Sequence, residues 1–139
     1  MKNLRNLLLA VGLIGVVGAS TSQSSSETFK LSGRVMGASG KNAVYVALWQ
    51  AHGFLVQPAQ TRRIAAGEEL VFHFDVPAGR WAIGAFEDRN GNGTLDMGTL
   101  GPEEPSGFWR PFDAPRKPEF VDVDSLINRD IPNANVTLK

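Results

Sequence analysis

The clearest strand pattern in the chain lies in residues 70–87, LVFHFDVPAGRWAIGAFE. Apolar side chains occupy every second position of residues 70–76, which is the period of a β-strand with one buried face. We therefore expect Phe72 and Phe74 to face the core. A Pro-Ala-Gly turn follows, and the apolar residues after it predict a second strand that begins with Trp81 in the core.

Shorter segments on both sides extend this pattern. Residues 29–35 alternate in the same way, and residues 44–49 are apolar on both faces, as is typical of a central strand. Further short strands are expected at residues 62–64, 120–123 and 136–138. Gly and Pro separate these segments at spacings of about ten residues, so the sequence predicts an all-β fold. We expect one immunoglobulin-like or transthyretin-like β-sandwich of about seven strands.

The first 26 residues predict export rather than folded structure. Lys2 and Arg5 precede an apolar run, and Val17-Gly18-Ala19 is a small-residue cleavage site, so residues 1–19 are expected to be a cleavable signal peptide. The Ser-rich residues 20–26 predict a flexible leader. The domain is then expected at residues 27–139, in the periplasm or secreted.

Composition excludes several classes of partner and site. The chain has no cysteine, which rules out disulfides and thiolate metal sites. Loss of Lys2 and Arg5 with the signal leaves 12 basic and 14 acidic side chains, a net charge of −2. Binding to nucleic acid or to an anionic membrane requires clustered Lys and Arg, so neither is expected of the mature protein.

The strand that begins at Trp81 leads directly into residues 88–96, DRNGNGTLD, where oxygen-bearing side chains occupy every second position around two glycines. Calcium takes about six to eight oxygen ligands, and short calcium loops supply side chains at positions 1, 3, 5 and 9 and a carbonyl at position 7. The glycines permit the tight backbone curl that such a loop needs. The residues at those positions are Asp88, Asn90, Asn92 and Asp96, with Thr94 at the carbonyl position.

The loop departs from helix-loop-helix calcium sites at position 12, where Thr99 replaces a bidentate glutamate. Glu87, Glu103 or Glu104 is available to supply a carboxylate from outside the loop, and spacing does not choose among them. The alternative interpretation is an ordinary turn, because Asn, Asp and Gly also dominate tight turns. We favour calcium, since a turn alone does not account for four oxygen side chains in step with two glycines.

Few other residues indicate a catalytic or ligand-binding role. Phe108 and Trp109 lie in an aromatic, proline-flanked segment that either covers one end of the sandwich or forms a binding surface. We favour the first, because exposed aromatic patches promote aggregation. His52 and His73 have no Cys or second His at metal-ligand spacing, so surface roles are expected for both.

The loop and its neighbours resemble known families. The segments around Gly33, residues 43–48 and residues 76–83, together with the 88–96 loop, are similar to transthyretin-like and adhesin B-type sandwiches. A longer resemblance, from about residue 29 to 138, is to DUF2141, a family of small exported bacterial proteins without an assigned activity. It is carried by residues 85–96, AFEDRNGNGTLD, and by the downstream Glu-Pro-Ser-Gly-Phe at residues 104–108. This resemblance implies a fold and a compartment.

We therefore expect an exported, non-catalytic β-sandwich with a calcium loop that acts as a binding or envelope accessory module, with a protein or glycan partner. One alternative is a small hydrolase, but transthyretin-like hydrolases carry a His/Arg cluster and a polar C-terminal signature, whereas this chain ends Asn-Val-Thr-Leu-Lys. A second alternative is a calcium-dependent carbohydrate-binding module, in which Trp49 or Trp109 stacks on sugar rings.

Overall fold

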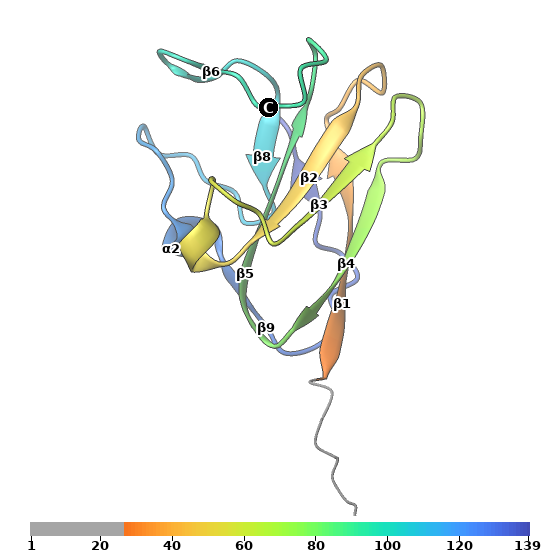
Figure 1. Cartoon of the computed structure of the whole chain (residues 1–139), viewed down its shortest axis with the longest axis vertical. Helices are drawn as coiled ribbons and strands as arrows, with labels where there is room; N and C mark the ends of the chain where they lie inside the picture. Colours follow the sequence, from red (N-terminus) through yellow and green to blue (C-terminus); the bar gives the residue numbers. More distant parts are fainter. Residues whose placement is uncertain (1–26) are drawn as a thin grey trace, which may run out of the picture.

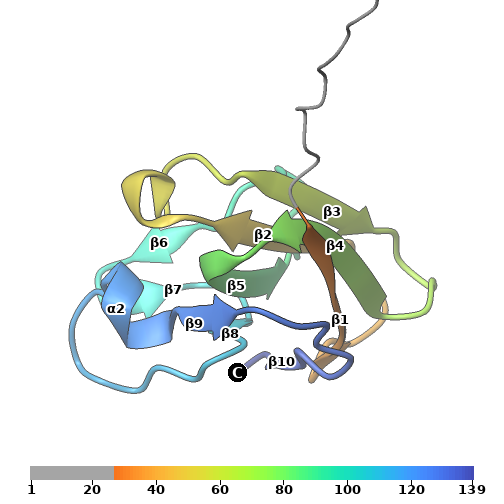
Figure 2. The ribbon, with the colours of Figure 1, turned by 90° about the horizontal axis from the view of Figure 1, so that it is seen from below.

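The computed structural model describes residues 27–139, which form two β-sheets around one core (Figures 1 and 2). The predicted signal and leader fall outside the described residues. The strands are β1 (Thr28–Met36), β2 (Val44–Trp49), β3 (Gln60–Ile64), β4 (Val71–Pro77), β5 (Gly79–Glu87), β6 (Met97–Gly98), β7 (Gly101–Pro102), β8 (Ser106–Phe108), β9 (Ser125–Ile127) and β10 (Val136–Thr137). The helices are the 3₁₀ turn η3 (Ala51–Gly53) and α2 (Phe120–Val123).

One sheet has the order β10-β1-β4 and the other the order β3-β2-β5-β8, with β9 paired to the start of β5. The β1–β10 pair is parallel, whereas the other strand pairs of these sheets are antiparallel. The hairpin of β6 and β7 stands apart. The predicted all-β sandwich is confirmed, and β2 is central in its sheet, between β3 and β5.

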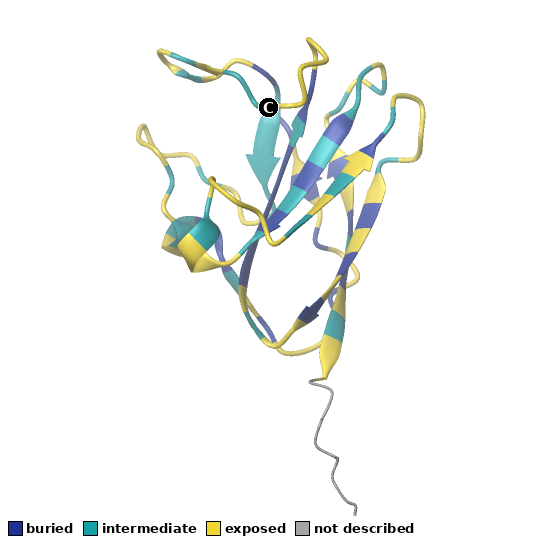
Figure 3. Cartoon of the chain, in the orientation of Figure 1, coloured by how far each residue is buried: buried dark blue, intermediate teal, exposed yellow. Residues whose placement is uncertain are grey.

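Burial follows the predicted alternation along β4 (Figure 3). Phe72 and Phe74 point into the core, while His73 and Asp75 between and beyond them are exposed. After the bend at the end of β4 the chain crosses to the other sheet, where Trp81 is only 5% exposed. The predicted core positions in this segment are therefore confirmed.

The C-terminal segment packs directly on the backbone of both sheets, which explains why glycine occupies two positions in the strands beneath it. A Cβ at Gly33 in β1 would lie 2.1 Å from the carbonyl oxygen of Ala134, and one at Gly107 in β8 would lie 2.1 Å from that of Thr137. Lys139 and Ser106 also exchange backbone hydrogen bonds of 3.1 and 3.3 Å. The predicted closing strand near residue 136 is confirmed, and it joins the two sheets.

The region after residue 95 differs from prediction. Within residues 27–139 there are ten strands, where about seven were expected, because β6 to β9 are two- or three-residue strands whose apolar pattern is too short to recognise. The strand expected from Phe120 is wrong. Residues 120–123 form α2, since the Asp122 carboxylate accepts the Glu119 N–H at 2.7 Å and closes a single turn.

Neither this helix nor any other in residues 27–139 has the length and apolar character that crossing a membrane requires.

Candidate metal site

Strand β5 ends at Glu87 and delivers the chain into the 88–96 loop, which lies beside the β6–β7 hairpin at one end of the sandwich (Figure 1). Gly91 and Gly93 have φ angles of 73° and 79°. Both lie in the left-handed region that glycine adopts without a steric penalty. The tight curl predicted from the two glycines is therefore present.

Hydrogen bonds draw the oxygen-bearing side chains of the loop together. Asn92 donates from its amide to the two oxygens of Asp96 at 2.9 and 3.2 Å, and Asn90 donates to the same carboxylate. Asn90 and Asn92 also accept backbone N–H groups two residues ahead, from Asn92 and Thr94, at 3.2 and 3.0 Å. A half-turn of either amide would present oxygen to Asp96 in place of nitrogen. The arrangement is thus that of an Asx-rich turn whose side chains converge.

Asp88 differs from the other loop residues because it is buried, with 4% exposure. Its Oδ2 accepts the N–H of Gly93 at 2.8 Å. Its Oδ1 is buried and has no hydrogen-bond partner in the described part of the chain. A buried carboxylate oxygen without a partner is costly, and a bound cation would supply the missing partner.

Glu104 closes the base of the loop. This carboxylate is 7% exposed, and its two oxygens accept the N–H groups of Arg89 at 2.6 Å and Asp96 at 3.2 Å. Glu103 beside it is exposed and lies against Gly98 in the hairpin, while its backbone N–H donates to the Asp96 carbonyl at 2.9 Å. Of the three acidic residues considered for position 12, Glu104 is therefore the one that spans the loop.

Glu87 is fully buried and turns away from the loop. It accepts the N–H of Ser39 at 3.1 Å and the side-chain amide of Asn42 at 2.8 Å, as well as the Ser39 hydroxyl. Burial raises the pKa of Glu87, but the hydrogen bonds from Ser39 and Asn42 outweigh burial and leave the pKa below its usual range. Glu87 therefore joins the β1–β2 connection to the end of β5, directly beneath the loop.

The number of carboxylates at the loop is small. Across residues 27–139, no three His, Cys, Asp or Glu side chains gather in a way that could hold a metal ion. A cation in the loop would therefore have few carboxylate ligands and would depend on amide and backbone oxygens as well. A hard cation accepts such ligands, so this donor set suits calcium better than zinc.

The aromatic residues considered as a binding surface lie elsewhere. Phe108 in β8 contacts Trp49 and Phe54, with ring centroids 6.4 and 6.0 Å apart. Trp109 is half-buried against the core, and its backbone N–H donates to the Ile83 carbonyl at 2.9 Å. Both side chains thus pack inward, whereas the two histidines are exposed.

A separate group of charged residues holds α2 in place. The buried Asp124 accepts a hydrogen bond from Arg80, and Arg110 donates to the Asp124 carbonyl at 3.1 Å. Arg116 makes two hydrogen bonds to Asp122, at 2.8 and 2.9 Å, and they hold the pKa of Asp122 at about 2. These pairs fix the position of α2 without invoking a ligand.

Residues 35–132 match the model of a family described as an uncharacterized protein conserved in bacteria, DUF2141. No curated protein was found to match the chain. Among solved structures, a DUF3823 family protein from Parabacteroides merdae ATCC 43184 is similar, with 16% identity and a TM-score of 0.40. The match covers 83% of this chain and 47% of that chain, so this chain spans about half the length of that structure.

Proposed function

The chain belongs to the DUF2141 family, and from that premise we propose that it is an exported, non-catalytic β-sandwich whose 88–96 loop binds calcium. In this proposal the protein acts as a binding or envelope accessory module in the periplasm or outside the cell. The ion stabilises the long excursion between β5 and β8, and with it the position of the β6–β7 hairpin.

One observation supports calcium more than any other. Oδ1 of Asp88 is buried without a hydrogen bond, at the first position of a loop in which three further oxygen-bearing side chains converge. A plain turn leaves this oxygen unexplained, because buried polar atoms normally have a partner. A cation beside Asp88 would neutralise the carboxylate and supply that partner.

The affinity should be modest. Two carboxylates in the loop suggest a dissociation constant on the order of 10⁻⁴ to 10⁻³ M, the range of extracellular calcium modules. At a free calcium concentration about a hundredfold above that constant, we expect a stabilisation of about 2.7 kcal/mol, which raises the melting temperature by several degrees. The measurement is a pair of thermal melts, with chelator and with calcium.

The matched variant is Asp88→Asn, which keeps an acceptor for the Gly93 N–H but removes the charge. It should lose the calcium increment, and in chelator it should be at least as stable as the wild type. Asp113→Ala removes an exposed carboxylate outside the loop and should keep the full increment. Equal calcium shifts in all three proteins, or none in any, would show that the loop is only a turn.

A second readout uses the single tyrosine of the chain. The Tyr45 hydroxyl lies 3.8 Å from where a Cβ on Gly93 would be, so it borders the loop. Terbium, a luminescent calcium analogue, should therefore be sensitised by excitation of Tyr45, and calcium should compete it away. Sensitisation that persists in Asp88→Asn would place the ion elsewhere.

Export is a separate prediction. The charged start, the apolar run and the small-residue site predict removal of residues 1–19. Expression in a bacterial host followed by intact-mass spectrometry should give a mature chain that begins at Ser20. Retention of Met1 in the exported fraction would contradict the proposed compartment.

A further inference from the structure

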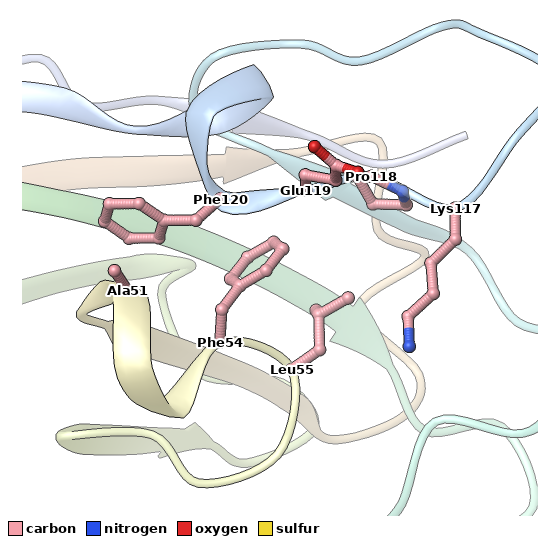
Figure 4. Close-up of a pocket in the computed structure, with 7 residues that line it drawn as sticks. All are labelled: Ala51, Phe54, Leu55, Lys117, Pro118, Glu119 and Phe120. Atoms are coloured by element: carbon pink, nitrogen blue, oxygen red, sulfur yellow. The ribbon is translucent and has the colours of Figure 1, made fainter.

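A surface hollow of about 400 Å³ lies between the loop that follows β2 and the residues that precede α2 (Figure 4). Phe54, Leu55 and Phe120 supply its apolar lining. Lys117 and Glu119 both line it as well, so its charged groups favour neither an anion nor a cation. The hollow therefore selects no class of ligand, whereas the 88–96 loop has a defined chemical reactivity.

The 88–96 loop contains the two Asn-Gly pairs of the sequence, Asn90-Gly91 and Asn92-Gly93. All four residues are exposed. Asparagine before glycine is the pair most prone to spontaneous deamidation, because glycine has no Cβ to keep its nitrogen away from the asparagine side chain. Asparagine is accordingly among the thermolabile residues that hyperthermophilic proteins use sparingly. The loop therefore carries two candidate sites for this modification.

Deamidation begins when the backbone nitrogen of the glycine attacks Cγ of the preceding asparagine. A bond forms between these two atoms, and the bond from Cγ to the side-chain nitrogen breaks. That nitrogen leaves as ammonia with the proton of the glycine N–H, and the product is a cyclic imide. Water then opens the imide at either carbonyl, which gives aspartate or isoaspartate. Water is the co-reactant, and no oxidation or reduction takes place.

The side chains of both asparagines are held beside the glycine nitrogen in the same way. Asn90 Oδ1 accepts the N–H of Asn92 at 3.2 Å, and Asn92 Oδ1 accepts the N–H of Thr94 at 3.0 Å. The ring that each hydrogen bond closes includes the nitrogen of the intervening glycine, and each bond polarises the carbonyl that is attacked. Both side-chain amides also donate to Asp96. These contacts therefore do not distinguish the two sites.

The N–H groups of the two glycines distinguish the sites. Gly93 N–H donates to Oδ2 of the buried Asp88 at 2.8 Å. Gly91 N–H makes no hydrogen bond to any group in residues 27–139, and a Cβ on Gly91 would meet nothing within 4 Å. Attack by the Gly93 nitrogen must first break a bond to a charged acceptor, which slows the reaction about tenfold or more. Asn90 is therefore the more reactive site.

We propose that Asn90 is a site of spontaneous deamidation in the folded protein, and that Asp88 protects Asn92 from the same reaction. The aspartate product places a further carboxylate in the loop and loses the side-chain amide that donates to Asp96. The isoaspartate product also routes the main chain through the former side chain, which lengthens the backbone at this turn by one carbon. The reaction needs no bound calcium, so it is independent of the function proposed above.

The test follows both sites in the full mature protein, incubated with chelator at neutral pH in water enriched in heavy oxygen. Each new carboxylate takes an oxygen atom from the solvent, which marks the reaction that occurs during the incubation. Peptide mapping by mass spectrometry, with fragmentation, then measures conversion at Asn90 and Asn92 separately. In the folded protein, Asn90 should react about tenfold or more faster than Asn92. In guanidinium, where the hydrogen bond to Asp88 is lost, the two rates should become similar.

Two variants test the role of Asp88. Asp88→Ala removes the acceptor of the Gly93 N–H, so Asn92 should then react at a rate close to that of Asn90. Asp88→Asn keeps an acceptor and should keep Asn92 the slower site. An unchanged rate at Asn90 in both variants shows that the loop is still folded, and the folded wild type decides the question if Asp88→Ala does not fold. Equal rates in the folded wild type, faster reaction at Asn92, no conversion of Asn90, or full protection of Asn92 in Asp88→Ala would each overturn the proposal.

Discussion

Replacement of Trp81 by alanine should lower the free energy of unfolding by about 3–5 kcal/mol, the cost of deleting a large buried aromatic side chain. Trp81 is 5% exposed at the start of β5, where it packs into the core between the two sheets. Its Nε1 also donates to the Pro77 carbonyl at 3.1 Å, across the bend that takes the chain from one sheet to the other. The variant therefore loses packing and the hydrogen bond that fixes this crossing.

Denaturant unfolding measures this effect. The midpoint of Trp81→Ala should fall with an unchanged slope, because the surface exposed on unfolding stays similar. Trp81→Phe should recover most of the packing and lose about 1 kcal/mol for the missing hydrogen bond. Val71→Ala, on the exposed face of β4, should change stability by less than about 0.5 kcal/mol. A small shift for Trp81→Ala would mean that the core does not depend on this side chain.

The strands that the sequence predicted are those with enough residues to show a period. In β4, Phe72 and Phe74 alternate with exposed residues, and this two-residue period identifies both the strand and its buried face. Strand β2 is apolar on both faces, and one face is buried while the other is half-buried. Strands β6 to β9 have two or three residues each, too few to show a period; β6 and β7 pair with each other as a local hairpin, whereas β8 and β9 pair with the distant β5.

Phe120 shows how a local hydrogen bond overrides an apolar pattern. Residues 120–123 read as the start of a strand, yet the Asp122 carboxylate captures the N–H of Glu119 and is itself held by Arg116. Asp favours such local bonds over ladder pairing, which is why it is depleted in strands.

The resemblance to DUF2141 that the loop motif suggested is confirmed, because family membership rests on longer stretches than one turn.

The loop itself was predictable, but its supports were not. The alternation of oxygen-bearing residues from Asp88 to Asp96 is local, so sequence spacing reveals it. Glu104 reaches Arg89 from 15 residues away, and Glu87 reaches Ser39 from 48 residues away. Sequence spacing indicated that both carboxylates lie near the loop. It did not indicate which groups each carboxylate binds, because only the packed sandwich brings those groups together.

Glu87 leads to the second large effect. Its carboxylate accepts three hydrogen bonds, from the Ser39 N–H, the Ser39 hydroxyl and the Asn42 side-chain amide. Glu87→Ala should destabilise the protein by about 3 kcal/mol, because these donors lose a charged acceptor in a buried position. Glu87→Gln should be intermediate, since its amide NH₂ would face a donor. Glu69→Gln, whose side chain is 72% exposed, is the matched control and should change little.

The pH dependence identifies the charge of Glu87 as the cause. Its pKa is lowered in the folded protein, so the unfolded chain takes up a proton first as the pH falls. The stabilisation is therefore complete above the unfolded-state pKa of about 4.3 and is lost as the pH falls through the lowered folded-state pKa. Urea unfolding of the wild type and Glu87→Gln between neutral and acidic pH should give stability curves that converge in acid. If the free energies of unfolding of the wild type and Glu87→Gln differed by the same amount at every pH, the effect would come from the shape of the side chain and not from the charge of its carboxylate.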